Sequence, residues 1–276
     1  MILLIGSTGN IGKHVVSYLK SQSIPIKEAI YQSKDNTQNT VNFDFLDAST
    51  FENALKGVRK VFFIRPPQLG NPSDLYPFLD YCKTKSIDHI VFVSLMGVEK
   101  NPIPPHAKIE KYIKKIKLPY TFIRPSFFME NLIYPHGDDI KSNNKIIVPA
   151  LKSKTSFIAC KDIGYVCGET LIKSPRHINH AYTLTGPKAL DYNQVATTFS
   201  KVLNRKITYT NPKMKAYTKH MIQLGFDKDY VKITKLLYFM TRLGTAKKIT
   251  STVESILKRP ATTLEDFIKE NKQCWL

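Results

Sequence analysis

The sequence predicts an α/β fold, in which helices cover both faces of a parallel sheet. Short, mostly apolar runs such as Ile2–Ile5 suit strands that are buried on both faces. Between these runs the apolar residues fall at helical spacing, as Ile11, Val15 and Leu19 do. Because parallel neighbours need a crossover helix, the alternation of strand and helix over residues 1–125 predicts a doubly wound parallel sheet.

The elements follow one another in a regular order up to residue 125. After the first strand and helix, strands are predicted at residues 26–31, 40–45, 60–65, 89–94 and 120–124. One helix is predicted to start at Ser49, because Ser49 to Glu52 matches a capping box, and others at residues 73–85 and 105–117. A pair of prolines after residue 65 is expected to stop that strand and hold an open loop.

Beyond residue 125 the chain becomes mostly helical and predicts a second, smaller lobe. A helix capped by Asp162 and a strand at 182–185 are expected to return to the sheet. The other predicted elements are strands at 145–148 and 206–210, helices at 192–203, 216–224 and 230–243, and a final helical pair before Trp275. The sheet domain is therefore predicted to comprise residues 1–125 and about 155–186, and the lobe about 126–154 and 187–276.

Glycines at positions 6, 9 and 12 join the first strand to the first helix. In a dinucleotide-binding turn, the first glycine permits the tight turn, the second lets backbone amides approach a pyrophosphate, and the third lets the helix pack on the strand. The phosphates would lie at the helix N-terminus, where unpaired amides favour an anion. The alternative is an ordinary glycine-rich loop. The turn residues predicted to bind the cofactor are Gly6, Thr8, Gly9, Asn10, Ile11 and Gly12.

The residues after the second strand bear on which nicotinamide cofactor is bound. A carboxylate there would hold the ribose 2′-hydroxyl of NAD(H), whereas this chain has Gln32, Ser33 and Lys34, with Asp35 one place later. These groups favour the 2′-phosphate of NADP(H), with NAD(H) possible. Four further residues at strand ends are assigned to the cofactor: Asp44, Phe45, Arg65 and Pro66. Asp44 would accept from the adenine amino group or, as an equal alternative, end a strand as a turn residue.

Composition and charge exclude several classes. An apolar fraction of 42% with 23% charged residues is that of a soluble globular protein, and the longest apolar runs are strand-sized. A strand that starts at residue 2 leaves no room for a leader, so we expect a cytoplasmic protein. The formal charge of +19 comes mostly from dispersed lysines, which makes a nucleic-acid partner unlikely. Four scattered cysteines predict no metal site.

Several segments in order resemble one family. They are Gly6–Gly12, Ile90–Ser94, Leu118–Asn131, Tyr182–Pro187 and Lys258–Phe267. With these the chain resembles the NmrA-like branch of the atypical short-chain dehydrogenases/reductases, which includes NAD(P)H:quinone reductases and redox-sensing regulators. The resemblance implies a Rossmann domain with a small helical lobe and NADP(H) in the cleft. Members that prefer NADP often carry arginine where this chain has Gln32.

The same resemblance directs attention to three candidate catalytic residues. Short-chain reductases place a serine after strand five, as Ser94 does here, followed by a tyrosine and a lysine four residues apart. This chain has His106 and Glu110 in place of that pair, on one face of the helix. His106 would hold an acceptor oxygen or move a proton, or it is a surface histidine bonded to a helix neighbour.

Beyond strand six, Phe127, Phe128, Met129 and Asn131 are predicted to contact the substrate, because an aromatic and thioether wall suits a flat apolar acceptor. The alternative is that some of them pack in the core, while Phe128 and Met129 line the site. Two functions follow. The favoured one is an NAD(P)H-dependent oxidoreductase that transfers hydride to a quinone or similar conjugated acceptor. The alternative is a dinucleotide-binding redox sensor with little or no catalysis, acting on a protein partner.

Overall fold

The computed structural model describes residues 1–33 and 39–276, which divide into two compact units. Unit 1 comprises Met1–Pro125, Cys160–Leu184 and Thr252–Arg259, and unit 2 comprises Ser126–Ala159, Thr185–Ser251 and Pro260–Leu276. Residues 252–259, which were predicted to belong to the lobe, are therefore part of unit 1.

Seven strands of the described residues form the parallel sheet of unit 1, in the order β3-β2-β1-β4-β5-β6-β8. Their bounds are β1 Ile2–Ile5, β2 Ile26–Ile30, β3 Thr40–Asn42, β4 Lys60–Ile64, β5 His89–Val93, β6 Tyr120–Pro125 and β8 His180–Leu184. Strands β1 and β5 are buried along their whole length, as their apolar runs predict. The doubly wound parallel fold is confirmed.

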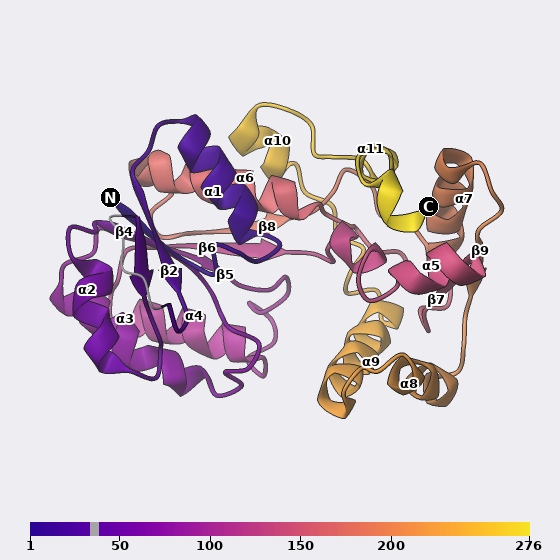
Figure 1. The fold of residues 1–276 in the computed structure, drawn as a ribbon, viewed down its shortest axis with the longest axis horizontal. Coiled ribbons are helices and arrows are strands. Elements are labelled where there is room, and N and C mark those ends of the chain that lie inside the picture. The colour runs from indigo at the N-terminus through magenta and orange to yellow at the C-terminus, as the bar shows by residue number, and fades with distance from the viewer. Residues whose placement is uncertain (34–38) are drawn as a thin grey trace. The chain divides into compact units, whose positions relative to one another are not determined.

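Helices cover both faces of this sheet (Figure 1). On one face are α1 (Gly12–Ser21), α6 (Cys160–Ile172) and α10 (Thr252–Leu257), and on the other are α2 (Phe51–Leu55), α3 (Tyr76–Thr84) and α4 (Pro105–Lys115). Three short 3-10 turns complete the unit: η1 (Ala48–Thr50), η2 (Pro72–Leu75) and η4 (Ser174–Arg176). The core cluster of unit 1 includes seven phenylalanines: Phe43, Phe45, Phe51, Phe63, Phe78, Phe92 and Phe122.

Two glycines let α6 lie directly against α1. A Cβ at Gly164 would come within 2.6 Å of His14 Cβ, and one at Gly168 within 2.4 Å of Tyr18 Cδ1. The Tyr18 hydroxyl donates to Glu169 Oε2 over 2.7 Å across the same contact. The spacing of four residues places both glycines on one face of α6, so the helices approach more closely than side chains would allow.

Two predicted helix starts are wrong. Asp47, not Ser49, is the N-cap of η1 and accepts from the Ser49 amide, so α2 begins only at Phe51. Helix α6 begins at Cys160, and Asp162 lies inside its first turn. The Asp162 side chain is fully buried and accepts from Arg259 Nη2 over 2.7 Å, a partner far along the chain that no local pattern reveals.

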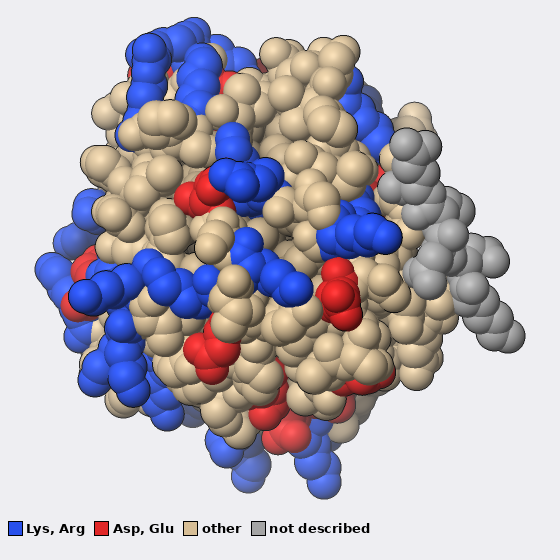
Figure 2. Space-filling model, turned by 90° about the vertical axis from the view of Figure 1, so that its left-hand side faces the viewer, with Lys and Arg blue, Asp and Glu red and all other residues tan. Residues whose placement is uncertain are grey.

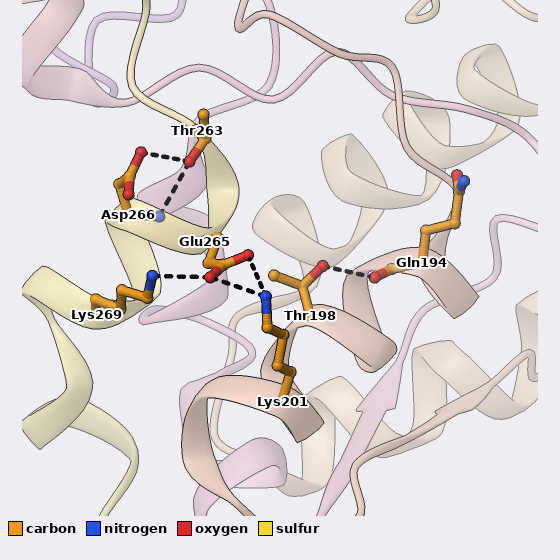
Figure 3. Close-up of polar contacts among 7 residues, drawn as sticks. All are labelled: Gln194, Thr198, Lys201, Thr263, Glu265, Asp266 and Lys269. Carbon is orange, nitrogen blue, oxygen red and sulfur yellow. Dashed lines mark hydrogen bonds and ion pairs between the residues drawn. The ribbon is translucent and has the colours of Figure 1, made fainter.

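Unit 2 is mostly helical. Its elements are η3 (Met129–Leu132), α5 (Gly137–Asn143), β7 (Lys145–Ile147), α7 (Tyr192–Leu203), β9 (Thr208–Thr210), α8 (Met214–Gln223), α9 (Lys228–Arg242), α11 (Leu264–Glu270) and η5 (Lys272–Trp275). Trp275 is fully buried and donates to the Leu132 carbonyl over 2.8 Å. Figure 3 shows how α11 is joined to α7, with Glu265 accepting from Lys201 on α7 and from Lys269 on its own helix.

Figure 2 shows one face of the molecule, on which the positive charge is dispersed. On that face Lys and Arg side chains form separate groups, interrupted by acidic and uncharged residues. No helix of residues 1–33 and 39–276 is long and apolar enough to cross a membrane.

The contact between α1 and α6 yields a stability prediction. Alanine normally favours a helix over glycine by about 1 kcal/mol. At Gly164 the added methyl also meets the Ile11 carbonyl oxygen and the Val15 amide nitrogen at 3.0 Å, and a backbone shift is required. We expect Gly164→Ala to lower the free energy of unfolding by about 1–3 kcal/mol in urea titrations. Gly70→Ala is the control, because a Cβ there meets nothing within 4 Å; a stabilised Gly164→Ala protein would contradict the contact.

Candidate functional site

The register of the sheet brings three predicted site residues to one edge. Strand β1 pairs with β4 and β4 with β5, with Ile5 opposite Phe63 and Ile64 opposite Val93. Gly6, Arg65 and Ser94 each follow one of these strands directly. The chain order of the sheet reverses between β1 and β4, which is where doubly wound sheets bind ligands.

The turn between β1 and α1 has the geometry that its glycines predict. Gly6 adopts a φ of +87°, which a side chain would disfavour. A Cβ on Gly12 would lie 1.9 Å from the Gly6 carbonyl oxygen, so only glycine lets α1 start there. At Gly9 the only atom of the described residues within 4 Å of an added Cβ, the two chain neighbours aside, is the Gly6 oxygen, at 3.5 Å. Gly9 is exposed, so the space beside it is open to a ligand.

The N-terminus of α1 lacks a side-chain cap. Ile11 occupies the N-cap position without a side-chain hydrogen bond, and the first turn holds no acidic residue. Thr8 and Asn10 are exposed and Ile11 is buried. Ser7, which was not predicted, has a buried hydroxyl with no partner among the described residues. Uncapped amides and an unsatisfied hydroxyl both suit an anionic ligand.

Of the predicted cofactor residues after β2 and β3, the structure describes Gln32, Ser33, Asp44 and Phe45. Gln32 is exposed with a φ of +53° and donates to the Tyr31 hydroxyl over 3.2 Å, and Ser33 is half-buried. Lys34 and Asp35 lie outside the described residues. Asp44 Oδ1 accepts from the Leu46 amide over 2.9 Å, which is the turn contact considered for it.

Phe45 is 4% exposed and packs edge-on against Phe43, with ring centroids 4.9 Å apart. Its side chain therefore belongs to the core, and only its backbone is left to face a ligand.

Arg65 holds the loop that follows β4. Its Nη1 donates to the carbonyls of Pro66 and Leu69 over 3.0 and 2.6 Å, and its buried Nε has no partner among the described residues. Burial lowers the pKa of the Arg65 guanidinium. Ser94 follows β5 at the same edge of the sheet. It is 5% exposed, and its hydroxyl is also without a partner in residues 1–33 and 39–276.

His106 lies near the N-terminus of α4, with its ring 6.0 Å from that of Phe92 on β5. Burial, with a smaller contribution from the positive charge of Arg65, lowers its pKa from 6.5 to about 4. The imidazole is therefore neutral at pH 7. It can offer one N–H as a donor but does not carry an ionisable proton at that pH.

Glu110 has a partner that was not predicted. Both carboxylate oxygens accept from Arg124 at the end of β6, from Nε over 2.9 Å and from Nη2 over 2.5 Å. The hydrogen bond raises the pKa of Arg124. Glu110 is 4% exposed, so it is engaged in this pair rather than available beside His106 as a catalytic partner.

The aromatic segment of unit 2 is partly core. Met129 is 1% exposed and packs in the main cluster of unit 2, so it does not form an open wall. Phe127 is half-buried against the same cluster, 6.4 Å from Tyr238 between ring centroids. Phe128 and Asn131 are also half-buried, and Phe128 pairs with Ile158 in a parallel bridge.

Among the described residues, no group of three or more His, Cys, Asp or Glu side chains could hold a metal ion.

Comparison with known proteins gives a match over nearly the whole chain. The model of the NmrA-like family matches residues 1–268. The NAD(P)H azoreductase of Xenophilus azovorans is 27% identical over 98% of this chain and 97% of its own length.

Two solved structures share the fold. An NADPH-dependent quinone oxidoreductase from Escherichia coli, complexed with NADPH, has a TM-score of 0.88 at 20% identity, over 99% of this chain and 100% of its own. The negative transcriptional regulator NmrA, in complex with NADP, has a TM-score of 0.75 at 16% identity, over 98% and 94%. At these identities the likeness shows the fold alone.

The space beside Gly9 yields a binding prediction. Because a small side chain at Gly9 has room in the free protein but would project where a phosphate must approach, Gly9→Val should leave the thermal midpoint nearly unchanged. The same substitution should weaken dinucleotide binding at least a hundredfold by calorimetry, since it blocks the turn amides. Gly137→Ala in α5 is the control, with only ordinary contacts at 3.7 Å and beyond. Retained affinity in Gly9→Val would contradict this placement of the phosphates.

Proposed function

The chain belongs to the NmrA-like family, and from the geometry of unit 1 we propose that it binds NADP(H) and transfers a hydride to a quinone or similar conjugated acceptor. The observation that carries this proposal is the turn between β1 and α1. It combines an uncapped helix, open space at Gly9 and the buried hydroxyl of Ser7, which has no partner in the part of the chain that the structure describes. Each of these features suits a pyrophosphate.

The residues present fit such a cofactor. The amides from Asn10 to Gly12 would bind the pyrophosphate, while the Gly9 amide already donates to the Gly6 carbonyl, and the Ser7 hydroxyl would gain a partner. Arg65 and Ser94 have buried donors without partners among the described residues, and they follow β4 and β5 at the same edge of the sheet. Gln32 and Ser33 would lie nearest the ribose of the adenosine half, where their neutral donors favour NADP(H) over NAD(H).

The reductase function gains support from relatives. The Xenophilus enzyme is named as an NAD(P)H azoreductase and the Escherichia coli structure as a quinone oxidoreductase. An azo bond and a quinone are both conjugated acceptors of a hydride, so we infer an acceptor of this chemical class for the present chain.

His106 would act as a hydrogen-bond donor toward the acceptor. When bound, the reduced nicotinamide supplies the hydride. A neutral imidazole N–H stabilises negative charge on an acceptor oxygen, and solvent water then supplies the proton to that oxygen. The missing tyrosine and lysine pair is tolerable on this route, because the anion of a reduced quinone is a weak base that water can protonate.

The direct test is oxidation of NADPH and NADH with a panel of quinones and azo compounds, run beside equilibrium binding of each dinucleotide. We expect tight NADPH binding and turnover on at least one conjugated acceptor. Tight binding without turnover on any of them would overturn the reductase and favour the sensor.

Replacing His106 tests its catalytic role. His106→Ala should lower kcat about tenfold or more, and full turnover in that variant would exclude a catalytic role.

The pH dependence of turnover tests the charge of His106. With a pKa of about 4, His106 stays neutral from pH 6 to pH 8. The ratio of wild-type to His106→Ala turnover should therefore be constant over this range. A histidine acting as imidazolium with a pKa of 6.5 would lose more than a factor of ten in the same ratio.

The alternative function keeps a specific observation in its favour. The regulator NmrA shares the fold and was solved with NADP, and Glu110 of this chain is engaged by Arg124. A sensor would bind the dinucleotide and act on a protein partner without catalysing hydride transfer. The turnover assay above separates the two.

A further inference from the structure

Arg124 is the strongest charged anchor of α4. Its guanidinium donates two hydrogen bonds to Glu110, and a third, from Nη1, reaches Glu99 Oε2 over 3.3 Å. The side chains of Arg124 and Glu110 are only 12% and 6% exposed, against 36% for Glu99. A planar guanidinium fixes both the distance and the direction of its partner, so this pair holds α4 in one orientation at the end of β6.

Apolar packing of Ile109 and Ile113 also holds α4, but the helix has few other polar contacts near His106 among the described residues. Its N-cap is Pro104, which makes no side-chain cap hydrogen bond, and within the described residues the His106 ring has no hydrogen-bond partner. The other polar contact of α4 lies farther along, where the Tyr112 hydroxyl donates to Asp80 over 2.7 Å. Glu110 is four residues after His106 and therefore on the same face, one turn away. The pair with Arg124 is thus the nearest polar anchor of that face.

We propose that Arg124 is a positioning residue: by holding Glu110, it fixes the first turns of α4 and keeps His106 beside Phe92. The inference rests on the proposed function in so far as His106 acts on the acceptor. It also accounts for the acidic residue that stands where related reductases have a lysine, because the carboxylate serves the arginine rather than the reaction.

The first test needs no turnover. The His106 ring is followed by NMR titration in the wild type, Arg124→Lys and Tyr112→Phe. Lysine keeps the charge but loses the two-point contact, so α4 loosens and water reaches the ring. We expect the pKa of His106 to rise from about 4 toward 6.5 in Arg124→Lys. It should stay unchanged in Tyr112→Phe, the control on the same helix.

A second variant guards against a folding defect. Glu110→Asp keeps both charges and shortens the side chain by one methylene, and it should raise the same pKa. Asp88→Asn is its control, because Asp88 forms a comparable two-point pair with Arg59 on the exposed surface of unit 1. If Arg124→Lys and Glu110→Asp both leave the His106 titration unchanged, the proposal is overturned.

The second test is a double-mutant cycle on turnover. Arg124→Lys should lower kcat about tenfold in the wild type and have no further effect in the His106→Ala protein, with the dissociation constant of NADPH unchanged in both. An equal loss in both backgrounds would assign Arg124 a purely structural role and overturn the proposal. If no acceptor is turned over by the wild type, the proposed function fails, while the titration still decides the inference.

Discussion

Close packing at three glycines organises unit 1. At Gly12 the first helix begins against the carbonyl of Gly6, and at Gly164 and Gly168 the sixth helix lies against the first. Each contact removes space that even a methyl group would need. The position of α1 therefore fixes where its free amides point, and α6 carries that constraint on to α10, which packs against it.

The edge of the sheet beside this turn combines positive charge with a neutral ring. Arg65 supports the loop after β4. Burial of His106 and, to a smaller extent, the positive charge of Arg65 lower the pKa of His106 and keep its ring uncharged. Arg124 is balanced by Glu110, so it adds little field of its own. The result is an edge that attracts an anion at one point and offers an uncharged donor at another. The two arginines differ in this way because Arg124 pairs with a carboxylate, whereas Arg65 donates to backbone carbonyls.

Local patterns predicted the parts of the molecule whose causes are local. The β1–α1 turn follows from its glycines, and the bounds of α7 match the predicted 192–203 because Asp191 forms a capping box with Gln194. Features set by distant partners were missed. From the sequence alone Asp162 is interpreted as a helix cap, but its carboxylate pairs with Arg259. Glu110 is interpreted as a catalytic residue, but its carboxylate pairs with Arg124. Met129 is buried against segments around Ile158 and Gly186, which no spacing near residue 129 reveals.

The return of residues 252–259 to unit 1 bears on how the chain is made. Unit 1 is assembled from three stretches of chain, and the last of these supplies Arg259 to the buried carboxylate of Asp162. During synthesis the sheet gains β8 only after β7 and α5 of the other unit have left the ribosome, and the pair between Asp162 and Arg259 forms only once residue 259 has emerged. A nascent chain stalled before residue 252 would thus expose the surface of α6 that α10 covers. Unit 1 is therefore completed only after most of unit 2 has been synthesised, long after its glycine-rich turn has emerged.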